Sequence, residues 1–207
     1  MPIKIRKIDP DHPEKEMVDL CAEEILRGGC VSFLTDTFYG LGCSLMDGAA
    51  VEMIFRLKHR PPNLATISLI SDPGSVEALT LGAPQCAETL MRRYWPGPLS
   101  IIFRASPLIP APSRGPEDTI ALRCPDHRLS RALIEAVGGP VVATSANRSG
   151  EHPARTSDEV ARIFGNQLGL ILDCGKATAT KPSTLVDVTS GQVRMLREGA
   201  VDIDPSL

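Results

Sequence analysis

The chain has 207 residues, of which 43% are hydrophobic and 23% are charged, and its formal net charge at pH 7 is −3. This composition predicts a folded protein with a sizeable core, which must be mainly aliphatic because aromatic residues make up only 4%. The negative net charge argues against a protein that wraps nucleic acid with a basic surface. No apolar run approaches the roughly 20 residues that span a membrane.

The cysteines are scattered, and none forms a Cys-x-x-Cys pair or has the spacing of a zinc site. They are Cys21, Cys30, Cys43, Cys86, Cys124 and Cys174. No signal-peptide pattern precedes them. We therefore expect reduced, buried thiols in a cytoplasmic protein and no metal site made of protein ligands.

Helix and strand signals alternate through the first half of the chain. In chain order the predicted elements are a helix over 14–27, a strand over 30–34, a helix over 49–58, a strand over 67–70, helices near 75–79 and 84–93, and a strand over 99–104. Residues 105–118 are rich in Pro, Ser and Gly, and we expect a surface loop there.

The alternation continues in the second half. The predicted elements are a strand over 119–124, a helix capped by Asp126, a strand over 140–143, a helix from the capping box Thr156–Glu159 to about Phe164, a strand over 170–173, and a hairpin of 184–188 with 192–197. The hairpin argues against an all-parallel sheet. We predict one α/β domain over 1–207, with its core over about 15–201 and a mixed sheet of about seven strands.

The common nucleotide-binding motifs are missing, since no Gly-x-Gly-x-x-Gly follows a strand and no P-loop is present. Polar residues instead stand where the predicted strands and helices end, which is where α/β proteins build their sites. They are Thr35, Asp36, Thr37, Lys58, Arg60, Arg123, Ser145, Asn147, Ser183, Thr184 and Arg197. If they converge, their cations and hydroxyls would suit a ligand with phosphates and carboxylates.

Each of these signals also has a simpler structural interpretation. Lys58 and Arg60 stand at a helix C-terminus, where the dipole favours cations. The residues around Ser145 suit an ordinary turn, and Tyr39–Gly42 suit a flexible one. Arg123 suits a surface strand. The histidines, at positions 12, 59, 127 and 152, are predicted to be solvated rather than catalytic.

Seven short segments follow one another in a distinctive order. They are Thr35–Gly42, Lys58–Pro61, Trp95–Pro98, Ala121–Pro125, Thr144–Gly150, Ser183–Thr184 and Leu196–Ala200. Together they resemble the YrdC-like threonylcarbamoyl-AMP synthases in their single-domain form. The paired Lys-x-Arg and Ser-x-Asn elements make the resemblance specific, and it covers nearly the whole chain.

The resemblance implies a twisted sheet of parallel and antiparallel strands, flanked by helices, around a large concave basic cavity. It implies a nucleotidyltransferase that converts L-threonine, bicarbonate and ATP, with Mg²⁺, into threonylcarbamoyl-AMP and pyrophosphate. The product would pass to a tRNA-modifying transferase complex that makes N6-threonylcarbamoyladenosine. Whether the chain itself contacts tRNA or double-stranded RNA stays open.

Site residues carry over by position. Thr37, Arg123 and Ser183 resemble the threonine-binding residues of the family. The residues that resemble its ATP-binding set are Lys58, Arg60, Thr119, Ser145, Asn147 and Arg197. Lys58 and Arg60 are also the catalytic candidates, because fixed cations stabilise the charge that develops when a carboxylate attacks the α-phosphate. No covalent nucleophile is expected.

Three departures from the family pattern leave other functions open. Leu34 stands where the family usually has proline, Leu64 where it has asparagine, and Leu69 where it has a histidine near the threonine pocket. A relative that adenylates a different carbamoyl donor is therefore one alternative. A non-enzymatic factor that binds double-stranded RNA in ribosome maturation is another, and strongly salt-dependent RNA binding would distinguish it.

Overall fold

A computed structural model describes residues 4–61 and 66–204. The described residues form one continuous ten-stranded sheet with the strand order β1-β8-β2-β3-β7-β4-β6-β5-β9-β10. The strands are β1 Ile5–Lys7, β2 Val31–Leu34, β3 Tyr39–Ser44, β4 Ile67–Leu69, β5 Leu99–Arg104, β6 Thr119–Arg123, β7 Val141–Ser145, β8 Leu170–Asp173, β9 Thr184–Asp187 and β10 Arg194–Arg197. The α-helices are α1 Lys15–Leu26, α2 Gly48–Lys58, α3 Val76–Leu79, α4 Gln85–Tyr94, α5 Arg128–Val137 and α6 Ser157–Phe164.

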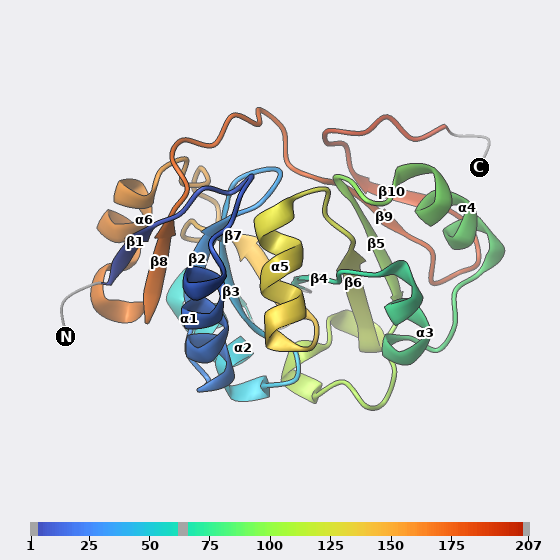
Figure 1. The fold of residues 1–207 in the computed structure, drawn as a ribbon. Helices are drawn as coiled ribbons and strands as arrows, with labels where there is room; N and C mark the ends of the chain where they lie inside the picture. Colours follow the sequence, from blue (N-terminus) through green and yellow to red (C-terminus); the bar gives the residue numbers. More distant parts are fainter. Residues whose placement is uncertain (1–3, 62–65, 205–207) are drawn as a thin grey trace.

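The sheet is mixed, as predicted. Parallel pairs join β1 to β8, β8 to β2, β4 to β6 and β5 to β9, while the other neighbours are antiparallel. Helices α1 and α5 pack against each other and lie together in front of the central strands in Figure 1. Because strand side chains alternate between faces, the positions that these helices do not cover are available to shape a cavity.

The predicted number of strands was too low for two local reasons. Strand β1 is three exposed residues long and carries no run of apolar residues, so periodicity could not reveal it. Strand β3 begins with Tyr39–Gly42, whose glycines had indicated a flexible turn. Packing requires a glycine at position 42, since a Cβ there would lie 2.5 Å from a ring carbon of Phe33 on the paired strand.

The two predicted helix caps had different outcomes. Thr156 caps α6 as expected, and its hydroxyl accepts a hydrogen bond from the Glu159 amide at 3.2 Å. The expected cap of α5 was wrong by one residue. The helix begins at Arg128, and the Nδ1 atom of His127 accepts from the Ser130 amide at 3.3 Å. His127 is therefore partly buried and structural, contrary to the prediction that it is solvated.

The core is aliphatic and the thiols are free, in line with the composition. Five of the six cysteines are buried, and Cys86 is partly exposed. Burial raises the pKa of the Cys30 thiol to about 12 and that of Cys174 to about 11, so both are protonated at neutral pH. In the described parts of the chain no helix is both long and apolar enough to cross a membrane.

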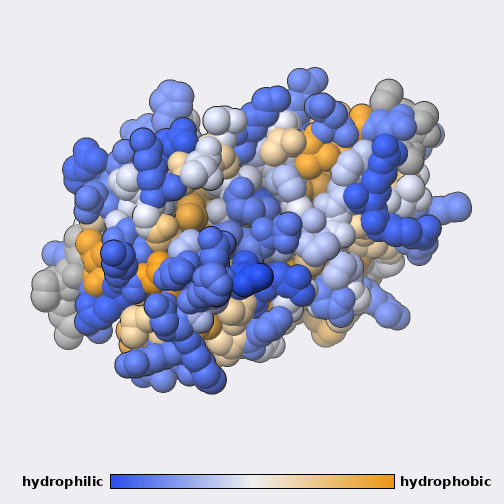
Figure 2. Space-filling view, turned by 45° about the horizontal axis from the view of Figure 1, so that its top comes forward, coloured by the Kyte–Doolittle hydropathy of each residue, from blue (hydrophilic) through white to orange (hydrophobic). Residues whose placement is uncertain are grey.

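The face of the molecule seen in Figure 2 is mostly hydrophilic. Its apolar side chains lie in separate small groups rather than in one continuous patch. This distribution is ordinary for a protein surface and gives no sign of a large apolar docking site on that face.

Candidate active site

A cavity of about 340 Å³ lies against the middle of the sheet. Small residues make room for it, since Gly40 on β3, Ala143 on β7 and Ala121 on β6 all line it. The full lining is Thr35, Thr37, Phe38, Tyr39, Gly40, Arg60, Ile67, Leu69, Ile102, Ala121, Arg123, Ala143, Thr144, Ser145, Asn147, Glu151, Pro153, Pro182, Ser183, Leu185 and Arg197.

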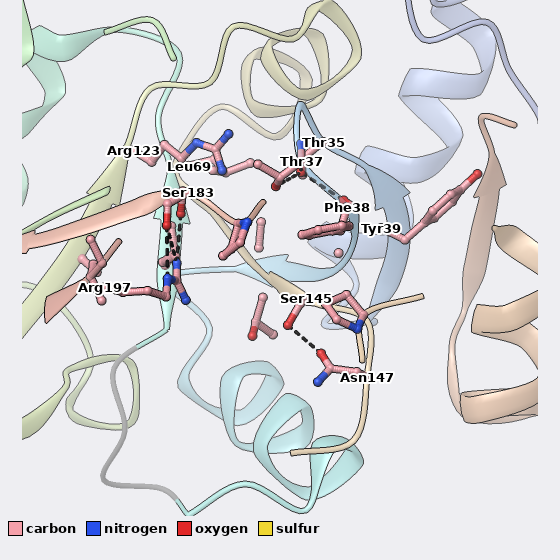
Figure 3. Close-up of a pocket in the computed structure, with 18 of the residues that line it drawn as sticks. Thr35, Thr37, Phe38, Tyr39, Leu69, Arg123, Ser145, Asn147, Ser183 and Arg197 are labelled. Atoms are coloured by element: carbon pink, nitrogen blue, oxygen red, sulfur yellow. Dashed lines mark hydrogen bonds between the residues drawn. The ribbon is translucent and has the colours of Figure 1, made fainter. Parts of the chain in front are cut away.

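Most of the residues singled out in the sequence meet in this cavity. Those that line it are Thr35, Thr37, Arg60, Arg123, Ser145, Asn147, Ser183 and Arg197. Figure 3 shows Arg123 close to Thr35 and Thr37, Arg197 beside Ser183, and the pair Ser145–Asn147 across the opening. They come from strands and loops up to 160 residues apart in the chain, so the sheet order is what assembles them.

Three arginines give the cavity its charge. Arg60 is placed by the end of α2, where His59 adopts a left-handed conformation (φ 50°) and turns the chain toward the sheet. Burial, and then the charge of Arg197, lower the pKa of Arg60. Burial, and then the charge of Arg123, lower the pKa of Arg197. This mutual repulsion means that an anionic ligand would relieve an existing electrostatic cost.

The Ser145–Asn147 turn is held from within. The Ser145 hydroxyl donates to Oδ1 of Asn147 at 2.5 Å, and Nδ2 of Asn147 donates to the carbonyls of Arg148 (2.8 Å) and Glu151 (2.7 Å). The side chain of Arg148 donates to the Leu57 carbonyl at the end of α2. The turn that follows β7 is thus tied to helix α2 and has a defined shape before any ligand arrives.

Lys58 lies behind this turn rather than in the lining. Its ammonium donates to the Ser145 carbonyl, to the Asn147 carbonyl at 2.9 Å and to Oδ1 of Asn147 at 3.2 Å, and the residue is 2% exposed. Burial, and then the nearby charge of Arg60, lower its pKa to about 8. In this structure the lysine predicted to contact ATP supports the loop that faces the cavity.

Thr119, like Lys58, is a predicted site residue that is not among the residues lining the cavity. It begins β6, whereas Arg123 ends that strand, and four residues of strand span about 13 Å. Its hydroxyl donates to the Pro116 carbonyl at 2.7 Å. Thr119 shares a face of β6 with Ala121 and Arg123, which do line the cavity, and its role in ATP binding stays a prediction.

Ser183 and Arg197 form the far wall. Arg197 donates from Nε to the Ser183 carbonyl at 3.1 Å and from Nη2 to the Ser183 hydroxyl at 3.1 Å. That hydroxyl lies 3.0 Å from the hydroxyl of Ser100 on β5. These neutral partners orient the Arg197 guanidinium without cancelling its charge.

Of the three positions that depart from the family pattern, two are described. Leu34 ends β2 and pairs with Tyr39, which is a structural position. Leu69 lines the cavity and lies in register with Arg123 on the parallel strand β6, so the two side chains share a face. Leu64 lies outside the described residues.

Two contributions to the site were missed in the sequence. Thr144 lines the cavity, and its hydroxyl lies 3.5 Å from Nη1 of Arg60. Glu151 supplies the one carboxylate among the lining side chains of the described chain. The available signal was that Thr144 precedes the Ser-x-Asn element and Glu151 follows it, but neither residue type is distinctive at such a position.

A mixed α/β sheet with a preformed cavity lined by arginines and hydroxyls defines a protein that binds small anionic ligands. The sequence matches the Sua5/YciO/YrdC family, described as "Telomere recombination", over residues 23–199. The chain belongs to this family.

Relatives and a solved structure agree with this membership. The chain is 35% identical over 92% of its length to the threonylcarbamoyl-AMP synthase of Pyrococcus abyssi, but spans only 56% of that protein. It is 34% identical over 89% of its length to the synthase of Marinobacter nauticus and covers 97% of that protein. The crystal structure of Pyrococcus abyssi Sua5 complexed with L-threonine superposes with a TM-score of 0.89 at 34% identity, over 94% of this chain and 57% of that one.

Proposed function

We propose that this protein is a threonylcarbamoyl-AMP synthase. It would combine L-threonine and bicarbonate, with loss of water, into N-carboxy-threonine, whose new carboxylate attacks the α-phosphate of ATP and releases pyrophosphate. The observation that carries the proposal is the convergence of Arg60, Arg123 and Arg197 on one cavity that also contains hydroxyls and an apolar floor. The names and the threonine complex of the relatives support the same reaction.

The cavity supplies two kinds of environment. Thr37, Arg123 and Ser183 would bind threonine, because a guanidinium and hydroxyls match its carboxylate and its side-chain hydroxyl. Arg60, Arg197 and the Ser145–Asn147 turn would bind the phosphates. The rate would come from positioning and from fixed cations that stabilise charge at the α-phosphate, without a covalent intermediate.

Mg²⁺ would enter bound to the phosphates of ATP. The lining has three arginines and one carboxylate, that of the exposed Glu151, which is not a cage of protein ligands. Mg²⁺ commonly keeps its waters and binds substrate phosphates in such sites, so the residues present fit this role. The ion would neutralise part of the triphosphate charge.

The product would be used by a tRNA-modifying transferase complex, and a cytoplasmic location is part of the same proposal. RNA binding as the primary function has less support, because the net charge is −3 and the arginines concentrate in a cavity rather than across a wide surface. The position of Leu69 favours testing an altered amino acid as the second candidate.

The proposal is tested by calorimetric titration of the purified protein with L-threonine, L-serine and ATP, in the presence of bicarbonate and Mg²⁺. We expect threonine to bind more tightly than serine, and ATP to bind. ATP binding without any preference for threonine would support the phosphate site but would indicate that the amine substrate is not threonine.

The same titration tests Arg60. Replacing it, Arg60→Ala, should weaken ATP binding by about tenfold or more without unfolding the protein, because it removes a cation that faces the ligand. The matched control is Arg56→Ala, on the same helix, whose side chain is 69% exposed and pairs with Glu52. Unchanged ATP affinity in Arg60→Ala would place the phosphates elsewhere.

A further inference from the structure

A buried ion pair stands directly behind the threonine-binding part of the cavity. The Arg123 guanidinium pairs with a carboxylate oxygen of Asp36, and the two side chains are only 4% and 13% exposed. Asp36 is not part of the cavity lining, although Thr35 and Thr37 on either side of it are. Its carboxylate therefore affects the site indirectly, through its ion pair with Arg123.

The local structure fixes the direction of this carboxylate. The Thr35 hydroxyl donates to the Phe38 carbonyl at 3.0 Å and lies 3.0 Å from the Thr37 hydroxyl, so the turn that carries Asp36 is closed by its own hydrogen bonds. Beyond the ion pair, neither carboxylate oxygen of Asp36 has a hydrogen-bond partner among the described residues. The ion pair with Arg123 is therefore the interaction that offsets the cost of burying the Asp36 charge.

The arginines of the cavity are consequently not equivalent. The charge of Arg123 is balanced by Asp36, whereas Arg197 is oriented by the neutral oxygens of Ser183. The balanced end of the cavity suits a zwitterion such as an amino acid, which carries no net charge. Arg197, whose guanidinium is held by neutral oxygens, keeps a charge that suits a polyphosphate.

We propose that Asp36 is a positioning residue that aims the Arg123 guanidinium at the amino-acid carboxylate and keeps that end of the cavity electrically neutral. The division of one cavity into an amino-acid end and a phosphate end would then depend on a residue that contacts neither ligand. This inference rests on the proposed function, because it takes Arg123 as the amino-acid anchor.

The test is Asp36→Asn, titrated separately with L-threonine and with ATP. Threonine affinity should fall by about 10- to 100-fold, because the guanidinium then keeps only the bond from its Nε atom to the Gly97 carbonyl (3.2 Å) and loses the partner that fixes its Nη2 atom. ATP affinity should stay the same or rise, with a steeper dependence on salt, because the cavity gains one positive charge. General loosening of the structure would weaken both ligands together, so loss of both overturns the inference.

Two further variants complete the design. Asp187→Asn is the matched control, because Asp187 is also 13% exposed and ion-paired, with Arg194, but does not line the cavity; it should leave both affinities unchanged. If Asp36→Asn does not fold, Asp36→Glu keeps the charge and moves the carboxylate by one methylene. It should weaken threonine binding alone, and unchanged threonine binding would overturn the inference. Failure of the wild-type protein to bind threonine would instead refute the proposed function.

Discussion

At the scale of single residues, the site depends on side chains that hold other side chains in place. Lys58 supports the turn containing Ser145 and Asn147 through three acceptors, and Asp36 pairs with Arg123. Sequence patterns predicted that Lys58 contacts ATP, whereas in the structure its ammonium contacts the turn behind the cavity. A motif shows that a residue belongs to a site, whereas only the arrangement in space shows which partner it contacts.

Lys58 gives a prediction about pH. Its lowered pKa of about 8 means that the ammonium loses a proton as the pH rises through that value, and the amine left behind has two donors for three acceptors. ATP affinity should therefore fall between pH 7 and 9 in the wild-type protein. In Lys58→Met the affinity should be lower throughout and should not change in this window, as measured by calorimetry at each pH.

Deprotonation of Lys58 should affect folding stability in the direction opposite to its effect on ATP affinity. The folded-state pKa lies below the ordinary value of 10.5, so between about pH 8 and 10.5 the unfolded chain binds more protons than the folded one. The contribution of Lys58 to stability should rise with pH over this window.

For the binding measurement, an ATP affinity that stays constant up to pH 9 would show that the Ser145–Asn147 turn does not depend on the charged form of Lys58.

At the scale of elements, the connection between β8 and β9 joins distant parts of the sheet. It runs along the top of the molecule in Figure 1, from the left edge to the right part of the sheet, and ends at the cavity residues Pro182 and Ser183. The Tyr39 hydroxyl secures its first residues, accepting from the Cys174 amide at 2.9 Å and donating to the Gly175 carbonyl at 2.7 Å. Figure 3 shows the Tyr39 ring pointing away from the cavity, toward this connection.

Tyr39→Phe should therefore destabilise the protein by about 1–3 kcal/mol, because it leaves the buried Cys174 amide and the Gly175 carbonyl without their partner. Urea denaturation measures this. The control is Tyr94→Phe, whose hydroxyl makes one exposed hydrogen bond to Asp202, at 3.3 Å, and whose loss should change stability by no more than about 0.5 kcal/mol. Equal effects of the two substitutions would show that the β8–β9 connection is not anchored by Tyr39.

At the scale of the whole molecule, the sequence predicted the mixed sheet and most elements because long amphipathic helices and apolar strands carry strong periodic signals. It missed β1, whose three exposed residues have no such signal, and it mistook the start of β3 for a turn because glycine also suits turns. The strand order that places Arg123 beside Leu69 depends on contacts between residues far apart in the chain.

The central claim is that the assembled cavity makes threonylcarbamoyl-AMP. The most direct test is to incubate the purified protein with ATP, Mg²⁺, L-threonine and ¹³C-bicarbonate and to detect the product by mass spectrometry. We predict an adenylate that contains threonine and one ¹³C, formed together with pyrophosphate and absent when any one substrate is omitted. Pyrophosphate release that continues without threonine or bicarbonate, with no labelled adenylate, would contradict the account.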